Sequence, residues 1–173
     1  MVDLGDAVAG RDYLISSGLA DPGRIGIFGA SFGGWLTLMS LAIYPAIWAG
    51  GVSLYGPFSV SWMMPGGHLH DPIWEANRSP SRMTDRITAP VLLIQAGHDT
   101  VATIDEARRF LNALREQGNV CDLKVFHDDT HGLPRRTGEA CVLVGEFFAR
   151  HLAPPPANDL PTLRDSGVYE PGG

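Results

Sequence analysis

The sequence predicts an α/β protein built on a parallel sheet with helices on both of its faces. Short apolar runs of the kind that form buried strands alternate along the chain with longer stretches of helical periodicity. At 173 residues, of which 45% are hydrophobic, the chain is long enough to form one domain with a buried core. We expect this domain over residues 1–152 and a disordered Pro/Gly-rich tail over residues 153–173.

The first half of the chain is expected to hold two helices and two strands. Apolar residues recur at mainly helical spacing over residues 3–17, with acids early in the segment, which predicts an amphipathic helix. A turn follows, and the largely apolar run 24–28 suits a buried strand. Residues 35–43 are apolar nearly all round and predict a helix buried against the sheet. A further strand is expected over residues 50–55.

The second half begins with an irregular, turn-rich insert over residues 56–82, which contains a short helix near residues 73–77. The apolar run 91–95 then predicts another buried strand. Thr103 and Glu106 form a capping-box pattern, which indicates the start of a helix.

This helix is expected to run to about Glu116, and a short alternating strand over residues 122–126 follows it. A last amphipathic helix is predicted over residues 138–152. Its apolar side is expected to consist of Val142, Leu143, Phe147 and Phe148.

The candidate nucleophile lies directly after the strand at 24–28, where Gly29, Ser31 and Gly33 form a GxSxG pattern that continues into a helix. Strand, GxSxG and helix together are typical of a nucleophile elbow, a turn so tight that side chains two residues from the serine would clash. Both glycines are therefore expected to be required. The backbone N–H of Phe32 would open the helix, where unpaired donors favour an oxyanion. An ordinary Gly-rich loop can contain the same pentapeptide, so residues elsewhere in the chain must decide between a loop and a nucleophile elbow.

That context is supplied by Asp99 and His131, which lie a few residues beyond the strands at 91–95 and 122–126. Because the carboxyl ends of parallel strands meet at one edge of a sheet, these side chains should lie beside Ser31. Ser, Asp, His is the chain order of the triad in α/β-hydrolases. We predict Ser31 as nucleophile, His131 as base and Asp99 as orienting acid, with no cofactor or metal required.

Other interpretations of the polar residues stay open. Asp99 can be a turn residue or helix cap, and His131 a surface loop histidine. Nearby competitors for the same roles are His98, His127 and Asp128. A second group of candidate metal ligands consists of His68, His70 and Asp71. This group lies in a turn-rich insert without a helical HExxH pattern, so we interpret it as solvated loop residues.

Composition excludes several classes of protein. The net charge is −6 and the 13 Lys and Arg residues are scattered, which argues against nucleic-acid binding. The chain shows neither a basic, apolar leader nor a run of about 18 apolar residues, so we expect a soluble, cytoplasmic protein. Cys121 and Cys141 are expected to be buried free thiols in a reducing compartment.

Five segments of the chain resemble the catalytic domain of the prolyl oligopeptidase family: DPGRIGIFGASFGGWLTL, GGVSLYGP, DRITAPVLLIQAGHD, EARRFLNALREQG and VFHDDTHG. The resemblance covers roughly residues 3–150. It implies an α/β-hydrolase fold and a serine hydrolase that cleaves peptide or acyl-peptide bonds through an acyl-enzyme intermediate. Ser31, Asp99 and His131 match the triad positions of the family. The aromatic residues that would line an acyl pocket, or pack in the core, are Tyr55, Trp62 and Trp74.

The chain also departs from the family pattern. Residues 100–103 replace a turn that is usually similar to Pro-Arg-Val-Pro, and Thr130 stands where glycine commonly precedes the histidine. An α/β-hydrolase sheet has eight strands, and this chain supplies the equivalent of the last four. We therefore expect the strand at 24–28 to have an unpaired edge, open to a missing N-terminal segment or a partner chain. The second oxyanion donor would come from the same missing part.

Two other functions are compatible with the same residues. Triad chemistry does not distinguish amide from ester substrates, so a carboxylesterase or a dienelactone-hydrolase-like enzyme is an alternative. A catalytically impaired fragment that acts as an interaction module is another, because an open strand edge invites strand addition.

Overall fold

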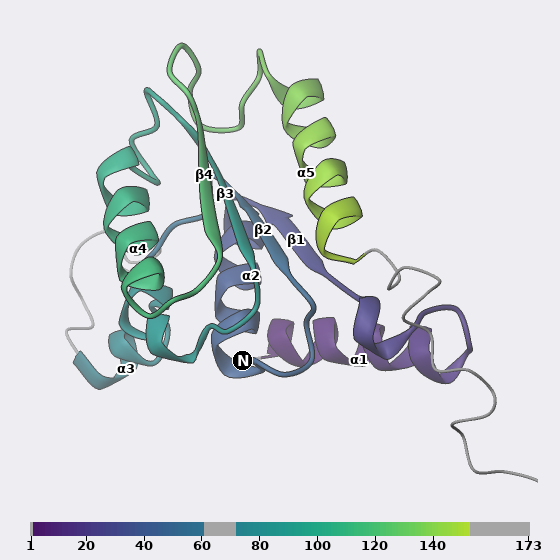
Figure 1. Cartoon of the computed structure of the whole chain (residues 1–173). Coiled ribbons are helices and arrows are strands. Elements are labelled where there is room, and N and C mark those ends of the chain that lie inside the picture. Colours follow the sequence, from purple (N-terminus) through teal and green to yellow (C-terminus); the bar gives the residue numbers. More distant parts are fainter. Residues whose placement is uncertain (1, 61–71, 153–173) are drawn as a thin grey trace, which may run out of the picture.

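The computed structural model describes residues 2–60 and 72–152, which form a four-stranded sheet with helices on both faces (Figure 1). The order of the strands is β1-β2-β3-β4, and all neighbouring pairs are parallel. The strands are β1 (Ile27–Ala30), β2 (Gly51–Leu54), β3 (Val91–Ala96) and β4 (Cys121–Phe126). The predicted parallel α/β architecture is confirmed. Because the strands all run the same way, the loops that follow them meet at one edge.

Five α-helices accompany the strands in the described part of the chain, and they alternate with the strands as expected. The α-helices are α1 (Val2–Ser16), α2 (Phe32–Ile43), α3 (Pro72–Ala76), α4 (Ile104–Glu116) and α5 (Thr137–His151). Three short 3-10 helices cover Pro22–Arg24, Pro80–Arg82 and Thr84–Arg86. None of the helices in residues 2–60 and 72–152 has both the length and the apolar character needed to cross a bilayer.

The core lies on both faces of the sheet, and β3, which is buried along its whole length, shows this most clearly. Side chains alternate across a strand, so Val91 and Leu93 pack in the cluster that contains α2 and α4 residues. Leu92 and Ile94 pack on the opposite face in the cluster that contains α5 residues. Figure 1 shows the same arrangement, with α5 on one side of the sheet and α2 and α4 on the other. A strand buried on both faces explains the continuous apolar run in the sequence.

Two details differ from the sequence-based expectation. The first strand begins at Ile27 rather than residue 24, because Asp21 accepts the Gly23 N–H and holds a 3-10 turn in front of it. In α5, Val142 is 60% exposed, so its predicted place on the apolar side is wrong. The buried residues there are Ala140, Val144 and Phe147. Their spacing of four and three residues keeps them on one helical face.

The N-terminus of α4 is fixed by the capping box that the sequence predicts. The Glu106 N–H donates to Thr103 Oγ1 at 3.3 Å, and the Thr103 N–H donates to Glu106 Oε2 at 3.1 Å. Both bonds satisfy amides that a helix start would otherwise leave unpaired. They hold the chain between β3 and α4 in one conformation.

Replacing Thr103 with alanine removes the hydroxyl that accepts the Glu106 N–H. We expect the free energy of unfolding of Thr103→Ala to fall by about 1 kcal/mol, measured by urea denaturation. Thr103→Ser keeps the hydroxyl and is the matched control. An equal loss in both variants would contradict the capping role.

Candidate active site

Ser31 occupies a strained turn between β1 and α2. Its φ of 54° and ψ of −116° lie in a region that residues other than glycine rarely adopt. The turn is held at both ends, because the Ser31 N–H donates to the Leu54 carbonyl at 2.9 Å and the Ser31 carbonyl accepts the Trp35 N–H at 3.0 Å. The strain is thus maintained by the end of β2 and the first turn of α2. Such strain is common where a side chain must be presented for chemistry.

The glycines of the elbow do not contribute equally. A Cβ at Gly29 would collide with the backbone of Gly33 in the first turn of α2. A Cβ at Gly33 itself would meet nothing within 4 Å among the described residues, so the expectation that both glycines are required is wrong for Gly33. The crowding is therefore one-sided, since a Cβ at Gly29 would meet the backbone of Gly33 whereas a Cβ at Gly33 would have free space. A second close approach lies at Gly34, where a Cβ would stand 2.8 Å from Gly56 Cα.

The structure brings Ser31, His131 and Asp99 into one chain of contacts. Ser31 Oγ lies 2.8 Å from His131 Nε2, and His131 Nδ1 lies 2.8 Å from Asp99 Oδ2. With the proton of the neutral imidazole on Nδ1, the ring donates to the carboxylate and accepts from the serine hydroxyl. The contacts fit that tautomer. The His131 side chain is 31% exposed, so it is open to a reacting molecule on one side.

The Asp99 carboxylate is fully buried, at 0% side-chain exposure, and both of its oxygens have donors. Oδ1 accepts the backbone N–H groups of Val101 at 2.8 Å and Ala102 at 3.0 Å, while Oδ2 faces His131. Burial of a carboxylate is costly unless such bonds replace its hydration. The loop after β3 therefore supports an anion at this position. The alternative interpretation of Asp99 as a local cap describes Oδ1, whereas Oδ2 is free for His131.

A further buried acid, Asp129, organises the loop that carries His131. Asp129 is 1% exposed, and its carboxylate accepts the N–H groups of Thr130 at 2.9 Å and Arg135 at 3.1 Å. Its backbone carbonyl accepts the His98 N–H at 2.9 Å, which joins this loop to the residue before Asp99. The only sequence signal is an acid two positions before the histidine. An acid in a turn is usually solvated, so its burial could not be inferred.

The nearby competitors for the triad roles lie at exposed positions. Asp128 forms an ion pair with Arg136 at 3.0 Å, and the hydrogen bond from that guanidinium lowers the pKa of Asp128 below its usual value. His98 and His127 are also exposed. The described contacts therefore join Asp99, rather than these residues, to His131.

The aromatic candidates for a substrate pocket differ in position. The Tyr55 ring contacts His131 edge-on, with the ring centroids 5.0 Å apart, and burial raises the pKa of its hydroxyl. Trp74 lies in α3 under the Arg78 guanidinium, 4.5 Å from the ring centroid. The Arg78 carbonyl accepts the Trp35 indole N–H at 2.9 Å, which ties the segment after α3 to helix α2. Trp62 lies outside the described residues.

Phe32 is the first residue of α2, so its N–H is one of the amides that an α-helix leaves without an intrahelical acceptor. This donor directly follows Ser31 in the chain. The Phe32 ring is stacked on Trp35, with centroids 5.2 Å apart. The amide is thus carried by a residue whose side chain is anchored.

The thiols and the candidate metal ligands are separate from these contacts. Both cysteines are free, and Cys121 is buried, which raises its pKa to about 12. Cys141 is exposed on α5, so its expected burial is wrong. Among residues 2–60 and 72–152, no three His, Cys, Asp or Glu side chains are grouped to hold a metal ion. The predicted solvated group at His68, His70 and Asp71 lies outside the described residues.

One family model matches most of the chain. The model described as the prolyl oligopeptidase family matches residues 1–154. Dipeptidyl peptidase family member 6 of Caenorhabditis elegans is 27% identical over 151 residues, which are 76% of this chain and 20% of that protein. A Methylorubrum extorquens protein, whose name assigns it provisionally to the carboxymethylenebutenolidases, is 35% identical over 136 residues, 76% of this chain and 40% of that protein.

Solved structures show the same likeness in three dimensions. A puromycin-hydrolyzing peptidase of Mycobacterium tuberculosis superimposes with a TM-score of 0.78 and 28% identity, covering 88% of this chain and 26% of that chain. The chain therefore spans about a quarter of the length of such relatives, between 20% and 26% for the first of each kind.

The one-sided crowding of the elbow is testable with two alanine variants. Gly29→Ala places a Cβ against the backbone of Gly33, so we expect the free energy of unfolding to fall by about 1–3 kcal/mol. Gly33→Ala should cause no loss, because its Cβ has space and alanine is the better helix former. Thermal unfolding followed by circular dichroism measures both. Equal destabilisation by the two changes would contradict this geometry.

The role of Asp129 is testable against its neighbour Asp128. Asp129→Ala leaves two part-buried amides without their acceptor and removes a buried carboxylate, and we expect the free energy of unfolding to fall by about 1 kcal/mol. The amides of Thr130 and Arg135 should also exchange hydrogen faster. Asp128→Ala is the control, since its carboxylate is exposed and should leave that exchange unchanged. Unaltered exchange in Asp129→Ala would exclude the proposed organisation of the loop.

Proposed function

The chain belongs to the prolyl oligopeptidase family, and on that premise we propose that it is a serine-type peptidase acting through Ser31, His131 and Asp99. The observation that carries the proposal is the unbroken chain of two contacts of 2.8 Å from the serine hydroxyl to the buried carboxylate. A hydroxyl beside a base, with the base oriented by an acid, is the arrangement that activates a serine nucleophile.

In the proposed mechanism, His131 Nε2 takes the hydroxyl proton as Ser31 Oγ attacks the substrate carbonyl carbon. A C–O bond forms, and the carbonyl π electrons move to the oxygen, which the Phe32 N–H stabilises. The tetrahedral intermediate then collapses, the C–N bond breaks, and the leaving amine takes the proton from His131. Asp99 stays ionised throughout and stabilises the imidazolium.

The acyl-enzyme is resolved by water in the second half of the reaction. His131 removes a proton from the water molecule as the water oxygen attacks the acyl carbon. The electron pair on the resulting oxyanion then re-forms the C=O bond and expels Ser31 Oγ. The proton on His131 passes to Ser31, which restores the starting state and releases a carboxylic acid. Tyr55, whose ring contacts His131, is proposed to border the acyl side of this site together with Trp74. No cofactor enters these steps.

Hydrolysis of small esters is the second candidate function. It is favoured by the 35% identity to the Methylorubrum extorquens protein, since a butenolide is a cyclic ester. The same serine chemistry acts on both kinds of bond, so the choice depends on the leaving group and the pocket.

The outer edge of β1 supports a proposal about what else the site needs. β1 pairs only with β2 among the described strands, and Phe28 on it is 63% exposed. The N–H groups of Ile27 and Ser31 bond towards β2, so those of Phe28 and Ala30 point away from it. We propose that a further strand, from another segment of the catalytic domain or from a partner chain, pairs with this edge. That part would also supply a second oxyanion donor.

A fluorophosphonate probe tests whether Ser31 is activated. We expect the wild-type chain to be labelled and Ser31→Ala not to be labelled. Asp99→Asn should react about 10²–10⁴-fold more slowly, because the amide no longer favours the required tautomer. Ser16→Ala, at an exposed serine far from the triad in sequence, should react as the wild type does. Labelling is read by gel fluorescence and intact mass.

Two outcomes would contradict the catalytic proposal. Equal labelling of Ser31→Ala would show that another residue reacts. A folded wild-type protein that is not labelled would favour the interaction module with an open β1 edge.

Substrate class is tested with p-nitroanilides of proline and alanine against p-nitrophenyl esters. A peptidase should hydrolyse at least one anilide, and Ser31→Ala should abolish the activity. Turnover of esters alone would establish the ester-hydrolase alternative instead.

A further inference from the structure

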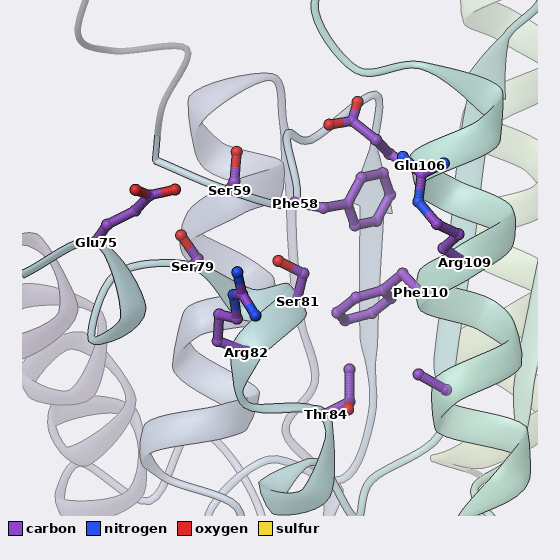
Figure 2. Close-up of a pocket in the computed structure, with 11 residues that line it drawn as sticks. Phe58, Ser59, Glu75, Ser79, Ser81, Arg82, Thr84, Glu106, Arg109 and Phe110 are labelled. Atoms are coloured by element: carbon purple, nitrogen blue, oxygen red, sulfur yellow. The ribbon is translucent and has the colours of Figure 1, made fainter. Parts of the chain in front are cut away.

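A cavity of about 420 Å³ lies between the segment that follows β2 and helix α4 (Figure 2). Its volume is within the range of pockets that bind small molecules. None of the three triad residues lines it. Phe58 and Phe110 both line it and contact each other, with their ring centroids 5.0 Å apart, so part of its wall is aromatic.

Two arginines line the cavity from different elements. Arg82 ends the 3-10 helix Pro80–Arg82, and Arg109 lies on α4, on the opposite wall in Figure 2. Neither guanidinium takes part in any of the ion pairs formed within residues 2–60 and 72–152. Both arginines are exposed, so their guanidiniums are accessible to a ligand from solvent.

The two acids on the cavity wall, Glu106 and Glu75, form no ion pair with Arg82 or Arg109 in the described part of the chain. Glu106 is already committed, because its carboxylate accepts the N–H of Thr103 at 3.1 Å and the hydroxyl of the same residue at 2.8 Å. Glu75 is the other acid of the lining. The neutral donors of Thr103 leave the negative charge on Glu106, so the lining carries two guanidiniums and two carboxylates with no described ion pair between them.

We propose that this cavity binds a carboxylate ligand with an aromatic or large apolar side chain, of the N-acyl amino acid class. A guanidinium pairs with a carboxylate through two parallel N–H bonds, which a neutral group cannot match. The apolar part of the ligand would pack on Phe58 and Phe110. The hydroxyl of Ser81, which also lines the cavity, is available to its amide.

The cavity adjoins the loop of Asp99 although it is separate from the triad. Glu106 lines the cavity and holds Thr103, which directly follows Ala102. The Ala102 N–H in turn donates to Asp99. A ligand in the cavity would therefore stand beside the residues that fix the acid, without contacting Ser31.

The test uses Ser31→Ala protein, which cannot form an acyl-enzyme, and two probes that differ only in charge. These are N-acetyl-L-phenylalanine and N-acetyl-L-phenylalaninamide, titrated by calorimetry and by amide NMR. We expect the acid to bind at least about tenfold more tightly than the amide, a difference of about 1.4 kcal/mol. Its largest chemical-shift changes should fall near Phe110 and Ala113 on the cavity wall.

Arginine variants locate the charge preference. Arg82→Gln combined with Arg109→Gln should remove the tenfold difference between acid and amide. Arg108→Gln is the matched control, because Arg108 is the neighbour of Arg109 on α4, is absent from the lining and pairs with Asp105. This variant should keep the preference. All three positions are exposed, so the fold should tolerate these changes.

Three results would overturn the proposal: equal binding of acid and amide, a preference that survives in the double variant, or shift changes centred on the triad rather than on α4. Because binding is measured without Ser31, these results are independent of the labelling experiment. The cavity can fail as a binding site while Ser31 proves to be active. Equally, the cavity can bind the acid while Ser31 is not labelled.

Discussion

The buried carboxylate of Asp99 is the group on which the rest of the candidate site depends. A carboxylate at 0% exposure needs donors for both oxygens, and each donor imposes a condition on the fold. Two donors are backbone amides of the loop after β3, so that loop must curl around Oδ1. The third is the His131 ring, so the loop after β4 must reach across to Oδ2. Asp129 and the capping box of α4 hold these two loops in place.

The same contacts explain why departures from the family pattern are compatible with the site. Residues 100–103 lack the prolines usual in the family, but Val101 and Ala102 hold Asp99 through backbone N–H groups, which do not depend on the side chain. Thr130 replaces a common glycine and is not among the described residues with a positive φ. No special backbone conformation requires glycine there, and its N–H is used by Asp129. The contacts that support Asp99 are thus made by backbone groups, although the side chains differ from the family pattern.

The sequence was sufficient to predict the order of the elements and the three residues that the structure brings together. Each of Ser31, Asp99 and His131 follows a strand, and the parallel direction of the strands alone places them at one edge. Features that depend on the third dimension were not predictable in this way. The burial of Asp129 depends on how the loops after β3 and β4 pack together. The free space that a Cβ at Gly33 would have depends on the three-dimensional course of the turn at Ser31. Neither leaves a periodic signal in the chain.

Support for the triad is uneven across the sheet, and this follows from the order of the strands. β3, which precedes Asp99, has a neighbour on each side and is buried along its whole length. β1 and β4, which precede Ser31 and His131, are the outer strands among those the structure describes. Asp129 compensates at β4, because it ties the His131 loop to the residue before Asp99. At β1 the strained turn of Ser31 relies on its bond to Leu54 in β2 and on the start of α2. Pairing of a further strand along β1 would therefore affect where the Ser31 hydroxyl lies relative to the His131 imidazole.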